Sequence, residues 1–284
     1  MMPCEELRLQ SLGLSLAAKA WGPVEAPPLL ALHGWLDNAE SFTPLSACLQ
    51  RRRLVALDLP GHGASQHRSP DAAYHFIDWI PAVMGAVRAL GWETFDLVGH
   101  SLGAGIAMAV AGTYPDRVRR LALIDSIGPL TATPEQVPER LARHVEESLQ
   151  RSLQERRPYA TLETMAATLA KVVPRLSAAS ARLLVSRGSR PVNGGYTWAA
   201  DNRLRGTSAA RLTEAQVEVF LRRIACPVLH VHAPDGYPVP TADLVRREAC
   251  VARLRRLELA GGHHVHMERP EAVGEALSSF LDAP

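Results

Sequence analysis

Cysteine and lysine are both scarce in this chain. Its 284 residues include four cysteines, which are widely separated and form no C-x-x-C pair, at positions 4, 48, 226 and 250. This spacing gives poor support to a zinc ribbon or a disulfide scaffold. Lys19 and Lys171 are the only lysines, so 29 of the 31 basic residues are arginines. We interpret the excess of arginine as a bias of composition rather than as a binding surface.

The chain also lacks an excess of charge of one sign and any long apolar run. Its 31 basic and 29 acidic residues give a net charge of +2, so no strong field is available for nucleic acid or an anionic membrane. The longest stretch of small apolar residues, around Ala104 to Ala111, is far too short to span a bilayer. The opening residues MMPCEELRLQ carry acids where a signal peptide has a basic end. We therefore expect a cytoplasmic protein without nucleic-acid or membrane partners.

The chain does contain a regular alternation of short apolar runs and helical patterns. Hydrophobic residues make up 47% and charged residues 21%, as in proteins with a buried core. The runs predict a hairpin at 7–9 and 14–20, then strands at 29–32, 53–59, 95–98, 121–124, 227–233 and 254–259. Helices are predicted at 76–90, 102–113 and 270–281. Apolar strands that alternate with helices predict a parallel sheet covered on both faces.

The alternation stops between Pro129 and about Glu218, where no strand is predicted. Helices are predicted there at 138–155, 162–171 and 178–187, followed by a loop with glycine and tryptophan at 188–205. A connection between two sheet strands needs far fewer residues than this segment has. We therefore expect a core domain of residues 1–128 and 209–284, with residues 129–208 inserted as a helical cap.

The strongest functional motif is Gly99-His100-Ser101-Leu102-Gly103, which fits G-x-S-x-G. An apolar strand leads into it and a helix of small residues leads out, which is the context that presents a nucleophilic serine. The serine must lie on a tight turn, so glycine is needed two residues to either side. The helix N-terminus would also direct amide groups at the site. The motif predicts Ser101 as a nucleophile; the alternative is a glycine-rich turn that only packs a helix.

A second motif, His33-Gly34-Trp35, follows the first central strand. Acyl transfer produces an oxyanion, which preorganised donors must stabilise. The amide of Leu102 can supply one donor and the amide of Trp35 the other; the alternative is an ordinary turn at a strand end. The substrate pocket is expected to be lined by residues of the two motifs, namely His33, Gly34 and His100.

The candidate general base lies in Gly261-Gly262-His263-His264-Val265-His266, between the last strand and the last helix. A base must reach the serine from a loop at the same sheet edge. His263, directly after two glycines, is the predicted base, and the two histidines that follow are expected beside the site. A metal site that joins this cluster to His230 and His232 is not favoured, because no carboxylate or cysteine lies at ligand spacing. We expect neither a metal nor another cofactor.

Together these motifs resemble those of the α/β-hydrolases, and more narrowly those of the serine hydrolase-like (Kraken-type) group. The resemblance rests on four segments of the sequence: His33 to Asn38, Leu57 to Ser65, Gly99 to Gly103 and His264 to Glu268. It covers nearly the whole chain and is weakest from about Pro129 to Thr207. It implies an α/β fold with a mostly parallel central sheet of about eight strands, helices on both faces and a helical cap insertion.

The acid of the expected triad is left open between two residues. It must orient the histidine and stabilise the imidazolium that forms during catalysis. Asp235 follows the strand after which the family usually carries its acid, although the resemblance places the acid one residue later, at Gly236. Asp125 ends the preceding strand, from which some family members draw the acid. Asp125 is slightly favoured, with a structural carboxylate as its alternative role.

Serine at position 101 excludes the carboxylate nucleophiles that haloalkane dehalogenases and epoxide hydrolases use on the same fold. The expected function is a serine hydrolase that cleaves an ester, thioester or lactone through an acyl-enzyme on Ser101. A non-hydrolytic enzyme of the same fold (a lyase, a C–C hydrolase or a perhydrolase) is one alternative, and a non-catalytic ligand-binding protein is another. The expected partner is a small acyl substrate, and the expected state is a monomer or homodimer.

Overall fold

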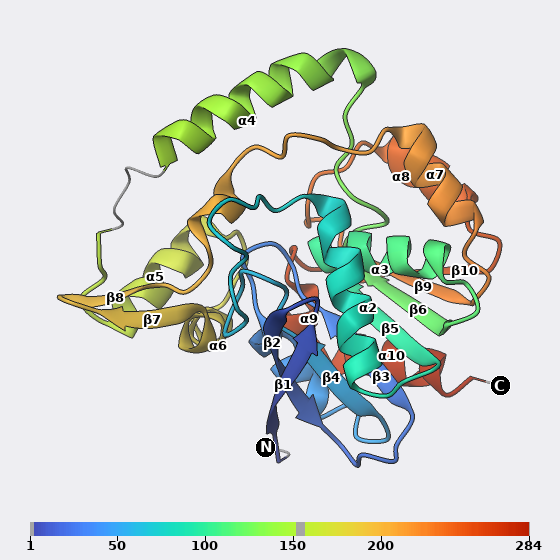
Figure 1. Cartoon of the computed structure of the whole chain (residues 1–284). Helices are drawn as coiled ribbons and strands as arrows, with labels where there is room; N and C mark the ends of the chain where they lie inside the picture. The colour runs from blue at the N-terminus through green and yellow to red at the C-terminus, as the bar shows by residue number, and fades with distance from the viewer. Residues whose placement is uncertain (1–2, 152–156, 284) are drawn as a thin grey trace.

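The computed structural model describes residues 3–151 and 157–283 and is built around one large sheet (Figure 1). Eight strands follow the order β1-β2-β4-β3-β5-β6-β9-β10. The pairs β1/β2 and β2/β4 are antiparallel, and the other neighbours are parallel. The strands are β1 (Glu5–Ser11), β2 (Leu14–Trp21), β3 (Pro28–Leu32), β4 (Arg53–Leu57), β5 (Phe95–His100), β6 (Val118–Ile124), β9 (Val228–His232) and β10 (Leu254–Glu258). The prediction of a mostly parallel sheet of about eight strands is confirmed.

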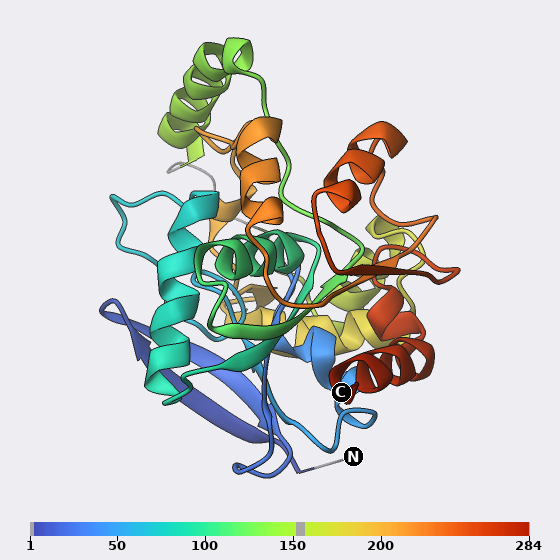
Figure 2. The ribbon, with the colours of Figure 1, turned by 90° about the vertical axis from the view of Figure 1, so that its right-hand side faces the viewer.

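Helices cover both faces of this sheet, as the sequence predicted (Figure 2). On one face lie α2 (Trp79–Ala89), α3 (Leu102–Thr113) and α7 (Glu214–Arg222), which share an apolar core with the strands. On the other face lie α1 (Thr43–Ser46) and α10 (Pro270–Leu281) with a second core. The central strands β4 and β5 are buried at every position, which explains why most of their residues are apolar.

Between β6 and β9 the chain leaves the sheet. It forms α4 (Val137–Arg151), α5 (Leu162–Val172), α6 (Ala178–Gly188), β7 (Ser189–Val192) and β8 (Gly195–Trp198) before α7. The three predicted helices are present, and the predicted extension of the first beyond residue 151 lies outside the described residues. The expectation of a loop without strands at 188–205 is wrong, because β7 and β8 pair as an antiparallel hairpin. The Asn193-Gly194 pair in its turn is a hairpin signal, and Gly194 and Gly195 have φ of 83° and 138°.

The inserted helices are attached to the segment that carries His263. Met267, in the short helix α9 (Val265–Glu268), belongs to the same buried apolar cluster as residues of α5 and α6. The Glu268 carboxylate accepts a hydrogen bond from Ser177 N at 2.9 Å, just before α6. A Cβ atom on Gly262 would lie 2.9 Å from the side chain of Arg175. The insertion and the histidine loop therefore pack as one unit.

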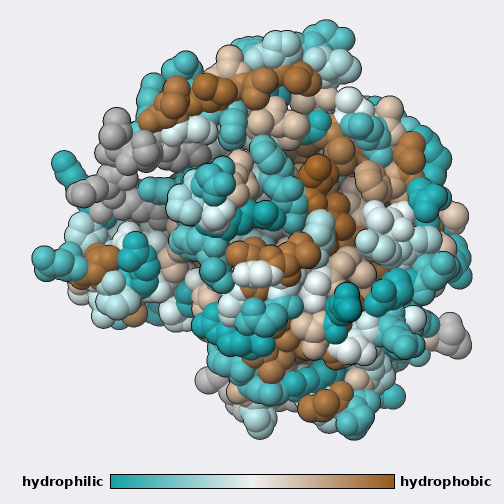
Figure 3. Space-filling model, viewed as in Figure 1, coloured by the Kyte–Doolittle hydropathy of each residue, from teal (hydrophilic) through white to brown (hydrophobic). Residues whose placement is uncertain are grey.

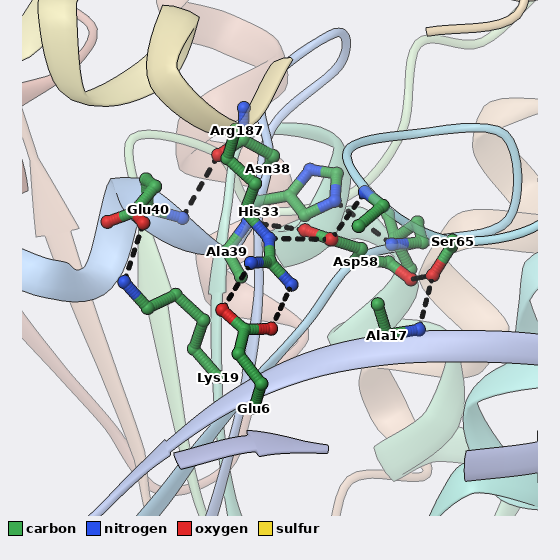
Figure 4. A network of polar contacts seen from close by, with 12 residues as sticks. Glu6, Ala17, Lys19, His33, Asn38, Ala39, Glu40, Asp58, Ser65 and Arg187 are labelled. Atoms are coloured by element: carbon green, nitrogen blue, oxygen red, sulfur yellow. Dashed lines mark hydrogen bonds and ion pairs between the residues drawn. The ribbon is translucent and has the colours of Figure 1, made fainter. Parts of the chain in front are cut away.

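A buried arginine also ties α6 to the sheet (Figure 4). Arg187 Nε donates to Asp58 Oδ2 at 2.7 Å, and its two terminal nitrogens bind the Glu6 carboxylate at 2.6 and 3.0 Å. Asp58 is completely buried and also accepts from Ala39 N at 2.7 Å and Ala64 N at 2.8 Å. A buried carboxylate is tolerated only with partners of this kind. Asp58, in the loop after β4, thus joins three parts of the chain.

The helix α4 lies across the rest of the insertion and presents an apolar stripe to solvent (Figure 3). The stripe consists of four residues spaced four apart, Val137, Leu141, Val145 and Leu149, with exposed fractions of 42, 49, 44 and 67%. Polar contacts attach the helix, including His144 Nδ1, which donates to Thr207 O at 2.8 Å. Within the described residues, no helix has both the length and the apolar character needed to cross a bilayer.

Candidate active site

Ser101 lies on the sharp turn between β5 and α3, with φ of 53° and ψ of −114°. This conformation is strained for a residue with a side chain, and such strain is concentrated at functional sites. A Cβ atom on Gly99 would lie 2.3 Å from Gly103 O, and one on Gly103 would lie 2.0 Å from Leu32 O. The two glycines of the motif therefore allow α3 to approach the sheet and place Ser101 at the carboxyl end of β5.

Three side chains form a continuous hydrogen-bonded chain at this edge of the sheet. His263 Nε2 lies 2.9 Å from Ser101 Oγ, and His263 Nδ1 lies 2.6 Å from Asp125 Oδ2. Because an ionised carboxylate can only accept, His263 Nδ1 carries the hydrogen and Nε2 accepts from the serine hydroxyl. The sequence predicted Ser101 and His263, and the structure places them within hydrogen-bond distance of each other.

The Asp125 carboxylate is held from several sides. Its side chain is 2% exposed, and it accepts hydrogen bonds from Tyr237 N at 2.9 Å and Ala233 N at 3.2 Å. Its own backbone has a φ of 52°, which is unusual for an aspartate that directly follows a strand. The Tyr237 ring also lies against the His263 ring, with centroids 5.7 Å apart. These contacts leave Asp125 one orientation, directed at the imidazole.

Asp235, the other candidate acid, lies outside this chain of hydrogen bonds. Its side chain is half exposed and pairs with Arg175 at 3.0 Å. The next residue, Gly236, is the position at which the family resemblance placed the acid. A Cβ atom there would lie 2.1 Å from Asp125 Oδ2. Asp125 therefore fills, from β6, the space that a side chain at position 236 would otherwise use.

The amides predicted to hold an oxyanion belong to segments that meet beside Ser101, because β3 and β5 are neighbouring parallel strands. Leu102 is the first residue of α3, where amide groups have no acceptor within the helix. Trp35 is followed by Leu36, whose φ of 63° turns the backbone sharply. Trp35 is 51% exposed as a residue, and its Nε1 donates to Leu204 O at 2.9 Å. The donor role of the two amides stays a prediction.

Two of the residues expected to line the pocket, His33 and His100, are completely buried. His33 Nδ1 donates to Gly34 O at 2.8 Å and its Nε2 accepts from Leu59 N at 3.0 Å. His100 Nε2 donates to His263 O at 2.8 Å. Burial lowers the pKa of His33 and lowers that of His100 to about 4, so both rings are neutral at neutral pH. The structure thus places these rings behind the reacting groups rather than at an open pocket wall.

A buried group of ionisable side chains behind His263 was not predicted. Asp37 lies 3.1 Å from His264 Nε2 and 3.5 Å from His100 Nδ1. Burial opposes the charge on Asp37, but the adjacent histidines hold the pKa of its carboxyl well below the usual range. Burial favours neutral His264, but the Asp37 charge raises the pKa of that ring. Asp37 and His264 are 227 residues apart in the chain, so no local pattern could have joined them.

The metal site that the sequence analysis did not favour is not assembled in the form considered there. His230 Nδ1 lies 2.7 Å from Glu248 Oε1 and does not join the His263 segment. Among residues 3–151 and 157–283, the side chains grouped closely enough to hold a metal ion are Asp37, His100 and His264. One donor atom from each lies within 4.8 Å of the other two.

Comparisons with known proteins concern the fold of the whole chain. A family model described as an alpha/beta hydrolase fold matches residues 27–270. A serine hydrolase-like protein of Danio rerio is 31% identical, covering 94% of this chain and 85% of that protein. The crystal structure of a hypothetical protein from Pseudomonas aeruginosa PAO1 has a TM-score of 0.91 at 39% identity, over 98% of each chain. A thioesterase domain from the curacin biosynthetic pathway has a TM-score of 0.87 at 25% identity, over 98% of this chain and 99% of that one.

Proposed function

Because this chain belongs to the α/β-hydrolase fold family, we propose that it is a serine hydrolase that cleaves a carboxylic ester or a related acyl bond through an acyl-enzyme on Ser101. One observation carries the proposal. The strained serine, His263 and Asp125 form a hydrogen-bonded chain with contacts of 2.9 and 2.6 Å. A nucleophile, a base within reach of it and a group that orients the base are the requirements of covalent acyl transfer.

The first half of the reaction would acylate the serine. Ser101 Oγ attacks the substrate carbonyl carbon while His263 Nε2 takes the hydroxyl proton. The carbonyl oxygen becomes an oxyanion, which accepts hydrogen bonds from the amides of Leu102 and Trp35. Asp125 stabilises the imidazolium and keeps its Nδ1–H in place. When the tetrahedral intermediate collapses, the alcohol or thiol leaves with the proton from Nε2, and the acyl group remains on Oγ.

The second half would release the acid. His263 Nε2, now neutral, takes a proton from a water molecule, whose oxygen attacks the acyl carbonyl. The same two amides hold the second oxyanion, and the proton returns from Nε2 to Ser101 Oγ as the carboxylic acid leaves. None of these steps transfers electrons to or from the protein. The insertion, which packs on the loop of His263, would shape the pocket and exclude bulk water.

The proposed bond class includes thioesters as well as oxygen esters. The same serine, histidine and amide donors serve both, because the leaving atom is protonated from Nε2 in either case. The structural similarity to the curacin thioesterase domain supports this inclusion. A ligand-binding protein without catalysis is less well supported, because binding alone does not require a strained serine held against an oriented imidazole.

A fluorophosphonate probe tests the proposal without knowledge of the natural substrate, since it phosphonylates an activated serine. We expect one label per chain on Ser101 in the wild type, none in Ser101→Ala, and ordinary labelling in the matched control Asp235→Asn. Turnover of p-nitrophenyl esters from acetate to decanoate should then show a burst of nitrophenol that Ser101→Ala abolishes. Absence of both the label and the burst in a folded protein would contradict the proposal and favour the binding alternative.

A further inference from the structure

The buried group behind His263 has the donor set of a transition-metal site. It offers a carboxylate oxygen of Asp37, Nδ1 of His100 and Nε2 of His264, with all three atoms within 4.8 Å of one another. The Asp37, His100 and His264 residues are 8, 0 and 7% exposed. One carboxylate and two imidazoles, combined with an open position, make a typical ligand set for Zn²⁺ and related divalent ions.

Two of the three distances between these donor atoms match a tetrahedral ion. Zn²⁺ binds nitrogen and oxygen at about 2.0–2.1 Å, so two ligands on one tetrahedral ion lie about 3.3 Å apart. Asp37 Oδ2 lies 3.1 Å from His264 Nε2 and 3.5 Å from His100 Nδ1. Two edges of the ligand tetrahedron are therefore present without any movement of the chain.

The hydrogen bonding of His100 leaves its Nδ1 able to act as a metal ligand. Its Nε2 donates to His263 O at 2.8 Å, so the lone pair of the neutral ring is on Nδ1. This nitrogen faces the Asp37 carboxylate at 3.5 Å. A metal-bound histidine commonly donates its other ring hydrogen to a main-chain carbonyl, as His100 does.

Gly34 lies directly beside these donors. A Cβ atom there would lie 2.8 Å from Asp37 Oδ2 and 2.9 Å from His100 Nδ1, so glycine is needed at this position. The ring of His266 lies 4.2 Å from that of His100, between centroids. Within the described part of the chain, both nitrogens of this fully buried ring lack a hydrogen-bond partner. A water molecule can supply the fourth ligand.

We propose that Asp37, His100 and His264 form a binding site for a divalent transition-metal ion, with Zn²⁺ as the model ion, directly behind the proposed general base. Occupancy would slow the reaction for two reasons. The ion holds His100, which holds the main chain of His263, and it adds positive charge beside an imidazole that must become positive. This inhibitory effect rests on the proposed function, whereas binding of the ion does not.

Binding is measured on chelator-treated protein by calorimetric titration with ZnCl₂, and by titration with CoCl₂ followed in the visible range. We expect one ion per chain and the intense absorption of tetrahedral Co²⁺. His264→Gln and Asp37→Asn should each weaken Zn²⁺ binding at least tenfold. His67→Gln is the matched control, because this exposed histidine also lies beside a carboxylate, 3.4 Å from Asp201, and it should bind as the wild type does.

Three results would overturn the proposal: no Zn²⁺ binds, the ligand variants bind as tightly as the wild type, or Co²⁺ shows the weak bands of an octahedral ion. The Co²⁺ spectrum needs only the wild-type protein, so it decides the question even if a variant does not fold. Fluorophosphonate labelling of Ser101 should slow at least tenfold with Zn²⁺ and recover with EDTA. If Zn²⁺ binds but Ser101 is never labelled, the hydrolase proposal fails and the metal site stands.

Discussion

Replacing Asp125 with asparagine tests whether the orientation of His263, and not only its presence, is needed for activity. In the structure, Asp125 Oδ2 accepts from both His263 Nδ1 and Tyr237 N, at 2.6 and 2.9 Å. The other oxygen, Oδ1, accepts from Ala233 N at 3.2 Å. An asparagine has one acceptor oxygen for these three donors, and where its NH₂ group replaces Oδ2 it cannot accept from Nδ1–H. The imidazole then gains by moving its hydrogen to Nε2, where it can no longer take a proton from Ser101. The expected loss in kcat/KM is on the order of 10⁴, or about 5 kcal/mol of transition-state stabilisation.

The assay is steady-state hydrolysis of p-nitrophenyl acetate, with urea unfolding of each variant to show that the fold is retained. Asp235→Asn is the matched control and should lose less than threefold, because its ion pair with Arg175 is half exposed. The double variant Asp125→Gly, Gly236→Asp should recover at least tenfold over Asp125→Gly, since it moves a carboxylate to the neighbouring backbone. Retention of more than a tenth of the activity by Asp125→Asn, or an equal loss in Asp235→Asn, would refute the reasoning.

Two further predictions concern stability. Arg187→Met should lower the free energy of unfolding in urea by about 3–5 kcal/mol, because it leaves the buried Asp58 charge without its cation. A change below 1 kcal/mol would show that the contacts of Arg187 contribute little to stability. Burial lowers the pKa of His62 from 6.5 to about 3, so the unfolded chain binds a proton below pH 6.5 that the folded chain does not bind until about pH 3. The contribution of His62 to stability is therefore complete above pH 6.5 and decreases as the pH is lowered, by about 2.7 kcal/mol at pH 4.5. The urea midpoint of His62→Gln should vary less with pH across this range than that of the wild type.

The sequence predicted elements well where burial is complete. The strand expected at 95–98 is β5 (Phe95–His100), and the helix expected at 102–113 is α3 (Leu102–Thr113). Strands buried on both faces are mostly apolar, so their pattern is easy to identify in the sequence. The hairpin of β7 and β8 lies partly exposed, so its composition follows solvent and turn requirements instead. Its one strong signal is the Asn-Gly pair, which lies within the segment predicted to be a loop.

For the candidate site, sequence order selected the serine and the histidine that the structure places side by side, but it left open which aspartate lies against the histidine. Asp125 and Asp235 both follow a strand at the correct edge, and no pattern within one chain distinguishes them. The difference between them arises where the loop after β9 meets the end of β6. Because Gly236 has no side chain, the Asp125 carboxylate can occupy the space beside it. The contacts of Asp37 with His100 and His264 likewise come from distant segments, so they follow only from the folded chain.

The attachment of the insertion to the histidine loop sets how such a molecule can open. Met267 is buried with α5 and α6, and Glu268 accepts from Ser177 at the start of α6. A motion that lifted these helices from the sheet would carry α9 along and draw His263 away from Ser101. On the proposed function, such an open state would have no base within reach of Ser101, so proton transfer would require the closed arrangement. Substrate entry and product release would then keep His263 beside Ser101 only through movements that leave α5, α6 and α9 together.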